Sequence, residues 1–278
     1  MSKGFLTVAQ VSEKVDYVKQ AYALALSVKA SQKEHNSFTL MTNAIVPEAY
    51  RSAFDYIVPI PWFYTTEDNM FAVESRWKIF HVTPYDETIV LDADMLLFDD
   101  ISLWWKNCQN KDLKFCSNIT DFRGNRVIDT VHRKAFVENE LPNTYFALHY
   151  FKKSQLALDF YKTLEFVIKN WEHHYSLFAP KQTPNWVSMD LASAITVEIM
   201  GIEELVIDKE CPLEFAHMKT PNQKWDFDSK WTNAVHYHMT DSGRLVVSNI
   251  DQRNLFHYIE KDFITDSIIE KLRSASGV

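Results

Sequence analysis

The sequence has 278 residues, of which 46% are hydrophobic and 24% charged, the balance expected of a globular protein with a sizeable core. Its formal net charge is −8 and no basic cluster occurs locally, so we do not expect nucleic acid as a partner. The same acidic balance means that an anionic ligand, such as a nucleotide diphosphate, would need a cation beside it.

The cysteines and the first residues bear on location. Cys108, Cys116 and Cys211 are odd in number and lack the spacing of a metal site. The segment MSKGFLTVAQ lacks the apolar core of a signal peptide, and no apolar stretch of 18 residues occurs. We therefore expect a cytoplasmic protein with reduced thiols and no transmembrane segment.

Predicted strands and helices alternate in the first hundred residues. The strands are expected at 5–9, 38–42, 56–60 and 89–91, and the helices at 14–30, after Pro47 and at 72–82. Helix 14–30 carries apolar residues at helical spacing, and 89–91 is an apolar run typical of a strand covered on both faces. This alternation indicates a doubly wound α/β sheet, in which ligands bind at the carboxyl ends of the strands.

The second half of the chain is less regular. We expect strands at 113–116 and 145–150, helices at 154–170 and 186–200, a hairpin from 235–238 and 245–247, and a last helix at about 259–273. No internal repeat, low-complexity tract or linker separates these elements. The sequence therefore predicts one compact α/β domain.

Two aspartates follow the apolar strand in the stretch TIVLDADMLLFDDI. Side chains two apart on a strand point the same way, so Asp92 and Asp94 are expected to converge while Ala93 faces away. Two carboxylates side by side repel each other unless a cation lies between them or one stays protonated. The pair therefore predicts a metal site, the alternative being an acidic turn without a ligand.

The segment ESRWKIFHVTPYDETIVLDADMLLFDDI resembles the nucleotide-sugar-dependent glycosyltransferases of the GT-A fold, most closely glycosyltransferase family 8, the glycogenin-like group. That family shows a basic residue on a helix, then Thr-x-Tyr, then an apolar strand ending in Asp-x-Asp. Here Arg76, sixteen residues before Asp92, stands where the family has Lys or Arg. Thr83 and Tyr85 match the Thr-x-Tyr step.

The resemblance covers roughly residues 5–101, and Asp16-Tyr17 looks like the family's uridine-binding start. It implies a GT-A type, Rossmann-like mixed sheet sandwiched by helices, in a single domain over 1–278. Within it, about 1–101 would bind the nucleotide sugar, and about 102–278 would bind the acceptor and include the C-terminal helix. The residues implied to contact the nucleotide sugar are Ala9, Tyr17, Arg76, Asp92, Ala93 and Asp94.

Three pieces of the second half are similar in kind. Asn143, in LPNTYFALHYF, resembles the family's Asn-Ser-Gly loop beside the sugar, with the Gly absent. Asp190, in WVSMDLASA, resembles the Asp of an Asp-Gln pair, with Leu191 in place of Gln. His236, in AVHYHM, resembles the late histidine that completes the metal site, but the Gly-x-x-Lys-Pro-Trp that commonly follows it is missing. Asn143 and Asp190 are thus the expected catalytic residues.

The expected metal ligands are Asp92, Asp94 and His236. His238 lies on the same face of the predicted strand as His236, so either histidine can fill the third place. Other readings stay open for single residues: Arg76 as an exposed helical charge, Tyr17 as an ordinary helix-face aromatic, and Asp190 as a helix-start residue.

The resemblance implies transfer of a hexose from UDP-glucose or UDP-galactose to a hydroxyl acceptor, such as a carbohydrate, with Mn²⁺ (or Mg²⁺) and with retention of configuration. A homodimer is left open. One alternative is a Mg²⁺-dependent phosphatase of the haloacid dehalogenase type, which also ends an apolar strand in Asp-x-Asp but has Thr or Val where Leu96 stands. A second alternative is a sugar-binding module without catalysis.

Overall fold

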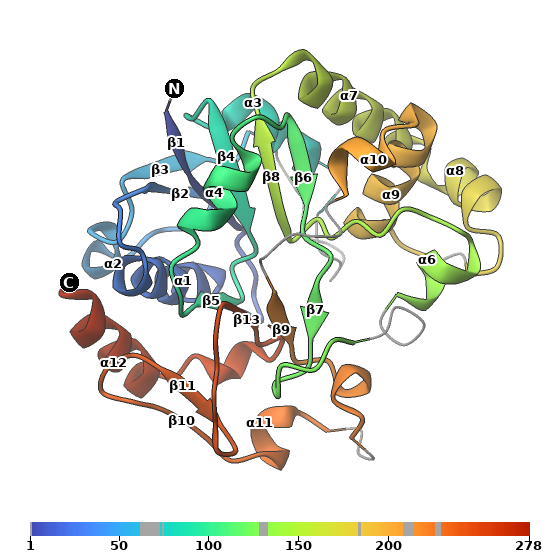
Figure 1. Ribbon diagram of the computed structural model, residues 1–278. Coiled ribbons are helices and arrows are strands. Elements are labelled where there is room, and N and C mark those ends of the chain that lie inside the picture. The colour runs from blue at the N-terminus through green and yellow to red at the C-terminus, as the bar shows by residue number, and fades with distance from the viewer. Residues whose placement is uncertain are drawn as a thin grey trace.

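The computed structural model describes residues 2–61, 73, 75–127, 133–182, 185–207, 214–225 and 229–278. A mixed central sheet with the strand order β3-β2-β1-β4-β8-β6 lies between two layers of helices (Figure 1). Its strands are β1 (Lys3–Ala9), β2 (Ser37–Thr42), β3 (Tyr56–Pro59), β4 (Glu87–Leu91), β8 (Leu148–Lys152) and β6 (Leu113–Phe115). The first four are parallel, and β8 is antiparallel to both β4 and β6.

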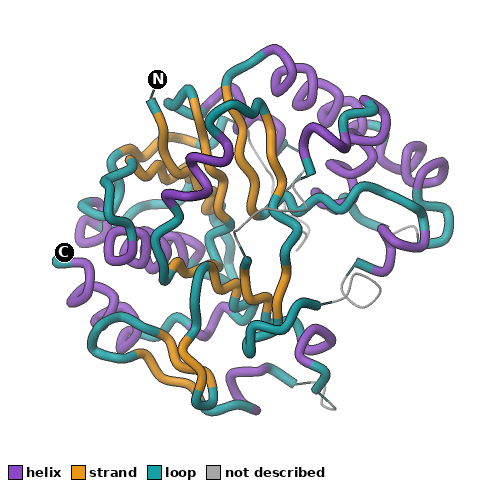
Figure 2. The backbone as a smooth tube through the Cα atoms, viewed as in Figure 1, coloured by secondary structure: helices purple, strands orange, loops and turns teal. Residues whose placement is uncertain are grey.

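Two smaller sheets accompany the central one, as the tube view in Figure 2 shows. One has the order β5-β13-β9-β7, formed by β5 (Met95–Leu97), β13 (Leu255–His257), β9 (Phe215–His217) and β7 (Ile119–Thr120). The other has the order β10-β11-β12, formed by β10 (Tyr237–Met239), β11 (Leu245–Val247) and β12 (Ile250–Asp251).

The helices cover both faces of the central sheet. One face packs against α1 (Tyr17–Ser31), α4 (Ser102–Cys108) and α12 (Asp266–Ser276). The other packs against α3 (Ile79–Val82), α7 (Gln155–Lys169), α8 (Trp171–Phe178) and α9 (Met189–Met200). The shorter helices are α2 (Glu48–Arg51), η1 (Arg76–Lys78), α6 (Lys134–Glu138), α10 (Glu203–Val206), η2 (Thr220–Gln223), α11 (Trp231–Ala234) and η3 (Lys261–Phe263).

The alternation of strand side chains explains the two cores. Phe5 and Ala9 of β1 point into the core beneath α1, whereas Leu6 and Val8 point into the core beneath α7 and α9. Since both faces of β1 are covered, every residue from Gly4 to Ala9 is buried, and all of these except Thr7 are apolar or Gly rather than alternating in polarity. The predicted α/β class and the mixed sheet between helix layers are confirmed.

Several predicted boundaries shift because capping residues set them. Helix 186–200 begins as α9 at Met189, since the side chain of Ser188 accepts a hydrogen bond from the Leu191 amide. The last helix, expected at about 259–273, is instead the short η3 followed by α12, which Thr265 caps in the same way.

Other predicted elements are shorter or displaced. Strand 145–150 becomes β8, strand 235–238 becomes β10, and the described part of helix 72–82 consists of η1 and α3, while residues 72 and 74 lie outside the described residues. Cys211 also lies outside them, and Cys108 and Cys116 are buried. In the described part of the chain, no helix has the length and apolar character needed to cross a bilayer.

Candidate active site

Asp92 and Asp94 follow β4 and lie in a turn between two sheets, so the strand alternation expected to align their side chains does not apply. The chain leaves the central sheet at the end of β4, passes through 92–94, and enters the smaller sheet at β5. The Asp92 amide anchors the turn by donating to the Ala147 carbonyl (3.0 Å). The turn, rather than the alternation of a strand, therefore brings the two carboxylates together, and Ala93 between them is buried.

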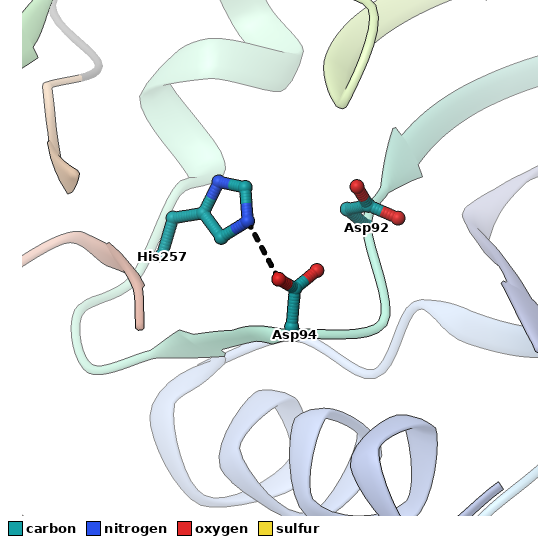
Figure 3. A group of neighbouring side chains, drawn as sticks. All are labelled: Asp92, Asp94 and His257. Atoms are coloured by element: carbon teal, nitrogen blue, oxygen red, sulfur yellow. Dashed lines mark hydrogen bonds and ion pairs between the residues drawn. The ribbon is translucent and has the colours of Figure 1, made fainter. Parts of the chain in front are cut away.

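The third side chain of this group is His257, whereas the sequence analysis expected His236. β13 runs antiparallel to β5, which sets His257 opposite Met95 and so beside the turn (Figure 3). One ligand atom from each of Asp92, Asp94 and His257 lies within 4.8 Å of the others. This is the group of metal-ligating side chains found among the described residues, and it does not include His236.

His236 lies away from this group, in the exposed segment just before β10. Its ring neighbours that of His238, with 5.8 Å between the centroids, and both side chains are exposed. The structure thus puts His257 in the place that the sequence analysis gave to His236. The strand that carries His257 was not predicted, because LFH is short and leads directly into a region expected to be helical.

The carboxylate of Asp94 is buried but not isolated. It accepts hydrogen bonds from His257 Nε2 (2.8 Å) and from the ammonium of Lys261. Burial alone would raise the pKa of Asp94, yet the nearby charges of His257 and Lys261 and their hydrogen bonds hold that pKa below its ordinary value. Asp94 is therefore an anion whose charge is balanced by groups from the C-terminal part of the chain.

A pocket of about 290 Å³ opens beside these residues. Arg76 lines it, with its guanidinium Nη1 3.7 Å from Asp92 Oδ1 and its side chain 19% exposed, so Arg76 is not a freely solvated charge. Tyr17 also lines the pocket, and burial, together with the charges of Asp94 and Asp92, raises the pKa of its phenol. Ala9 is fully buried at the end of β1, between two residues that line the pocket.

Asp190 also lines the pocket. Its Oδ1 accepts from the Phe146 amide (2.8 Å), and its Oδ2 accepts from Arg133 Nη1 (2.7 Å). The same guanidinium donates through Nε to Asn143 Oδ1 (2.9 Å). Buried Arg133, which the sequence analysis missed, thus joins the two predicted catalytic residues into one ion-paired cluster.

The pocket also has residues that no motif indicated. His217 and Lys219 come from β9 and the turn after it, and Trp186 and Ser188 from the segment before α9. The fold brings these four residues to the pocket from segments that are far apart in the chain. The hydrophobic periodicity of the sequence does not reveal such proximity.

No protein-family model matches the sequence, and no curated protein does. Among solved structures, the fold is similar to that of LgtC, a galactosyltransferase crystallised with donor and acceptor sugar analogues, with a TM-score of 0.53, 13% identity, and coverage of 99% of this chain and 95% of that one. It is also similar to mouse xyloside xylosyltransferase 1, with a TM-score of 0.51, 10% identity, and coverage of 92% and 97%.

The bifunctional glycosyltransferase WbbM gives a TM-score of 0.55 at 11% identity, and this chain, covered over 98% of its length, spans about half (49%) of that one. The neighbours share the GT-A fold, so the predicted fold is confirmed. At these identities the likeness concerns the fold.

Asp94→Asn should lower the free energy of unfolding of the metal-free protein by roughly 2 kcal/mol or more, because it removes the anion against which His257 and Lys261 are packed. Since the folded-state pKa of Asp94 is depressed, its stabilising effect is complete above about pH 4 and is lost as the pH falls through the folded value. Urea denaturation in EDTA at neutral and acidic pH measures both effects.

The matched control is Asp92→Asn, since the Asp92 side chain is more exposed (26% against 7% for Asp94) and its nearest cation is further away. Asp92→Asn should lower the free energy of unfolding by clearly less than Asp94→Asn does. An Asp94→Asn variant as stable as the parent would show that repulsion between the two carboxylates outweighs their pairing with His257 and Lys261.

Proposed function

We propose that the protein is a metal-dependent glycosyltransferase that moves a hexose from a nucleotide sugar to a hydroxyl acceptor. The observation that supports this most is the Asp92–Asp94–His257 group, which lines the same pocket as Asp190 in a glycosyltransferase fold. UDP-glucose or UDP-galactose as donor and a carbohydrate acceptor are part of the proposal, as is retention of configuration. A cytoplasmic location and a homodimer stay predictions.

The donor set fits Mn²⁺ or Mg²⁺. It offers two carboxylates and one imidazole, the hard oxygen and borderline nitrogen ligands that suit Mn²⁺ well. The depressed pKa of Asp94 means that no proton has to leave this ligand first. Asp92, Asp94 and His257 would hold the metal, whose positive charge would stabilise the negative charge that grows on the leaving diphosphate.

Two cationic side chains of the protein would also stabilise the negative charge on the leaving diphosphate. Lys261 contacts Asp94, and Arg76 lies near Asp92 at the pocket wall, so both are close enough to the aspartates to face a diphosphate. We propose that Lys261 supplies the positive charge that the missing Lys-Pro-Trp motif leaves unassigned. Tyr17, on the same side of the pocket, would contact the base or ribose.

Asp190 and Asn143 would act on the sugar side. Both are fixed by Arg133, so their oxygen atoms keep one position. Asp190 lines the pocket as a carboxylate that can accept a hydrogen bond from a sugar hydroxyl, which orients the ring for attack by the acceptor. Leu191, in place of the family's Gln, leaves Asp190 as the polar side chain of that pair.

Incubation with a panel of UDP-sugars and Mn²⁺ should release UDP, and EDTA should abolish the release. Slow release is expected even without the acceptor, because water can take the place of the acceptor hydroxyl. Release of inorganic phosphate from small phosphate esters would instead indicate the phosphatase, and binding of the donor without any release would indicate the sugar-binding module.

His257→Ala should lower the affinity for Mn²⁺ by at least about tenfold and slow UDP release, because it removes one of three protein ligands. His236→Ala is the control, with an exposed histidine outside the group, and should change the affinity less than about twofold. Isothermal titration with Mn²⁺ measures both. If His236→Ala weakens binding and His257→Ala does not, the third ligand is the one the sequence analysis chose.

A further inference from the structure

Tyr145 stands where the resembling family has the Gly of its Asn-Ser-Gly loop, two residues after Asn143. The Tyr145 side chain makes a contact that a Gly could not make. The hydroxyl of Tyr145 lies 2.5 Å from Nδ1 of His257, whose other nitrogen, Nε2, bonds to Asp94. We propose that Tyr145 is a positioning residue that holds His257 with Nε2 turned to the metal; this rests on the metal site proposed above.

The two ring nitrogens of His257 have separate tasks in this arrangement. Nε2 is the nitrogen next to the aspartates, whereas Nδ1 is occupied by the phenol. A metal on Nε2 needs the lone pair of that nitrogen, so the remaining proton of the neutral ring must lie on Nδ1 and be donated to the Tyr145 oxygen. The phenol thereby selects the tautomer that can bind a metal.

A hydroxyl suits this place better than a carbonyl or a carboxylate. In the metal-free site Nε2 carries a proton and donates to Asp94 whether the ring is charged or neutral, and when the ring is neutral the phenol donates to Nδ1. When Nε2 binds a metal, the direction reverses and the phenol accepts from Nδ1. A hydroxyl can rotate to do either, whereas a carbonyl can only accept. His257 therefore keeps one orientation in both states.

Packing fixes the phenol independently of its hydroxyl. The Tyr145 ring stacks on Phe215, with 4.7 Å between centroids, and meets the ring of His217 edge-on at 6.0 Å. The Arg133 guanidinium lies 5.7 Å from its centroid on the Asp190 side. Tyr145 is buried and only 4% exposed, so Tyr145→Phe removes the hydrogen bond while leaving these contacts in place.

The chain supplies a matched control in Tyr161. Its hydroxyl bonds to Nε2 of His149 at 2.7 Å, and both side chains are fully buried. There the tautomer is already set, since His149 Nδ1 donates to the Phe146 carbonyl. Tyr161→Phe therefore deletes an equally buried phenol–imidazole hydrogen bond that has no part in the metal site.

The test is isothermal titration of Mn²⁺ into the full-length protein and the two variants, with thermal unfolding in EDTA measured in parallel. Tyr145→Phe should weaken Mn²⁺ binding about tenfold or more, the usual effect of removing the partner of a metal-bound histidine. Tyr161→Phe should change the affinity less than about twofold while lowering Tm. Nitrogen chemical shifts of the His257 ring with Mg²⁺ should show the Nδ1–H tautomer in the parent protein.

Three outcomes would overturn the proposal. The first is an Mn²⁺ affinity of Tyr145→Phe equal to that of the parent protein. The second is an equal loss of affinity in Tyr145→Phe and Tyr161→Phe. The third is a His257 ring that carries its proton on Nε2 with Mg²⁺ bound. If the parent protein binds neither ion, the metal site itself fails, and the role of Tyr145 fails with it. Normal Mn²⁺ binding by the parent with an unaffected Tyr145→Phe variant would leave the proposed function standing.

Discussion

A buried carboxylate cannot stay charged inside a protein without compensation, and the arrangement around Asp94 follows from that constraint. Asp94 lies at the start of β5, almost completely enclosed, and its compensation comes from His257 and Lys261, more than 160 positions further along the chain. The small sheet that contains β5, β13 and β9 supplies this compensation, because its antiparallel pairing of β13 with β5 sets His257 beside the turn.

The turn at residues 92–94 connects the central sheet to the smaller sheet that contains β5. β4, an inner strand of the central sheet, ends at the edge where the carboxyl ends of the parallel strands meet, and β5 of the next sheet begins after three residues. Ligands in open α/β sheets bind at this edge, so the acidic turn lies where a nucleotide sugar would arrive. Residues from the N-terminal half, such as Tyr17 and Arg76, and from the C-terminal half, such as Lys261, line one pocket there.

The sequence predicted the features that depend on local pattern. Apolar runs and helical spacing located the four parallel strands and α1, and the Asp-x-Asp stretch located one side of the site. What it missed depends on long-range pairing: β13 is three residues long, and nothing within LFH shows that it pairs with β5. His236 was chosen because its flanking residues matched a motif, whereas proximity to Asp94 is decided by strand register. Arg133 was missed for a similar reason, since its partners Asn143 and Asp190 lie 10 and 57 positions away.

Two residues that differ from the resembling family, Tyr145 and Leu191, lie at or next to contacts of the same buried residue, Arg133. A Gly makes no side-chain contact, whereas the Tyr145 side chain contacts the ring of His257 on one side and the Arg133 guanidinium, which binds Asp190, on the other. Leu191 follows Asp190 where the resembling family has Gln, so no side-chain amide is present there. The Arg133 guanidinium binds the Asp190 carboxylate instead. One tyrosine side chain therefore contacts residues of both clusters. A Gly at position 145 would lack both the hydrogen bond to His257 and the contact with Arg133, so the identity of this one residue bears on both clusters at once.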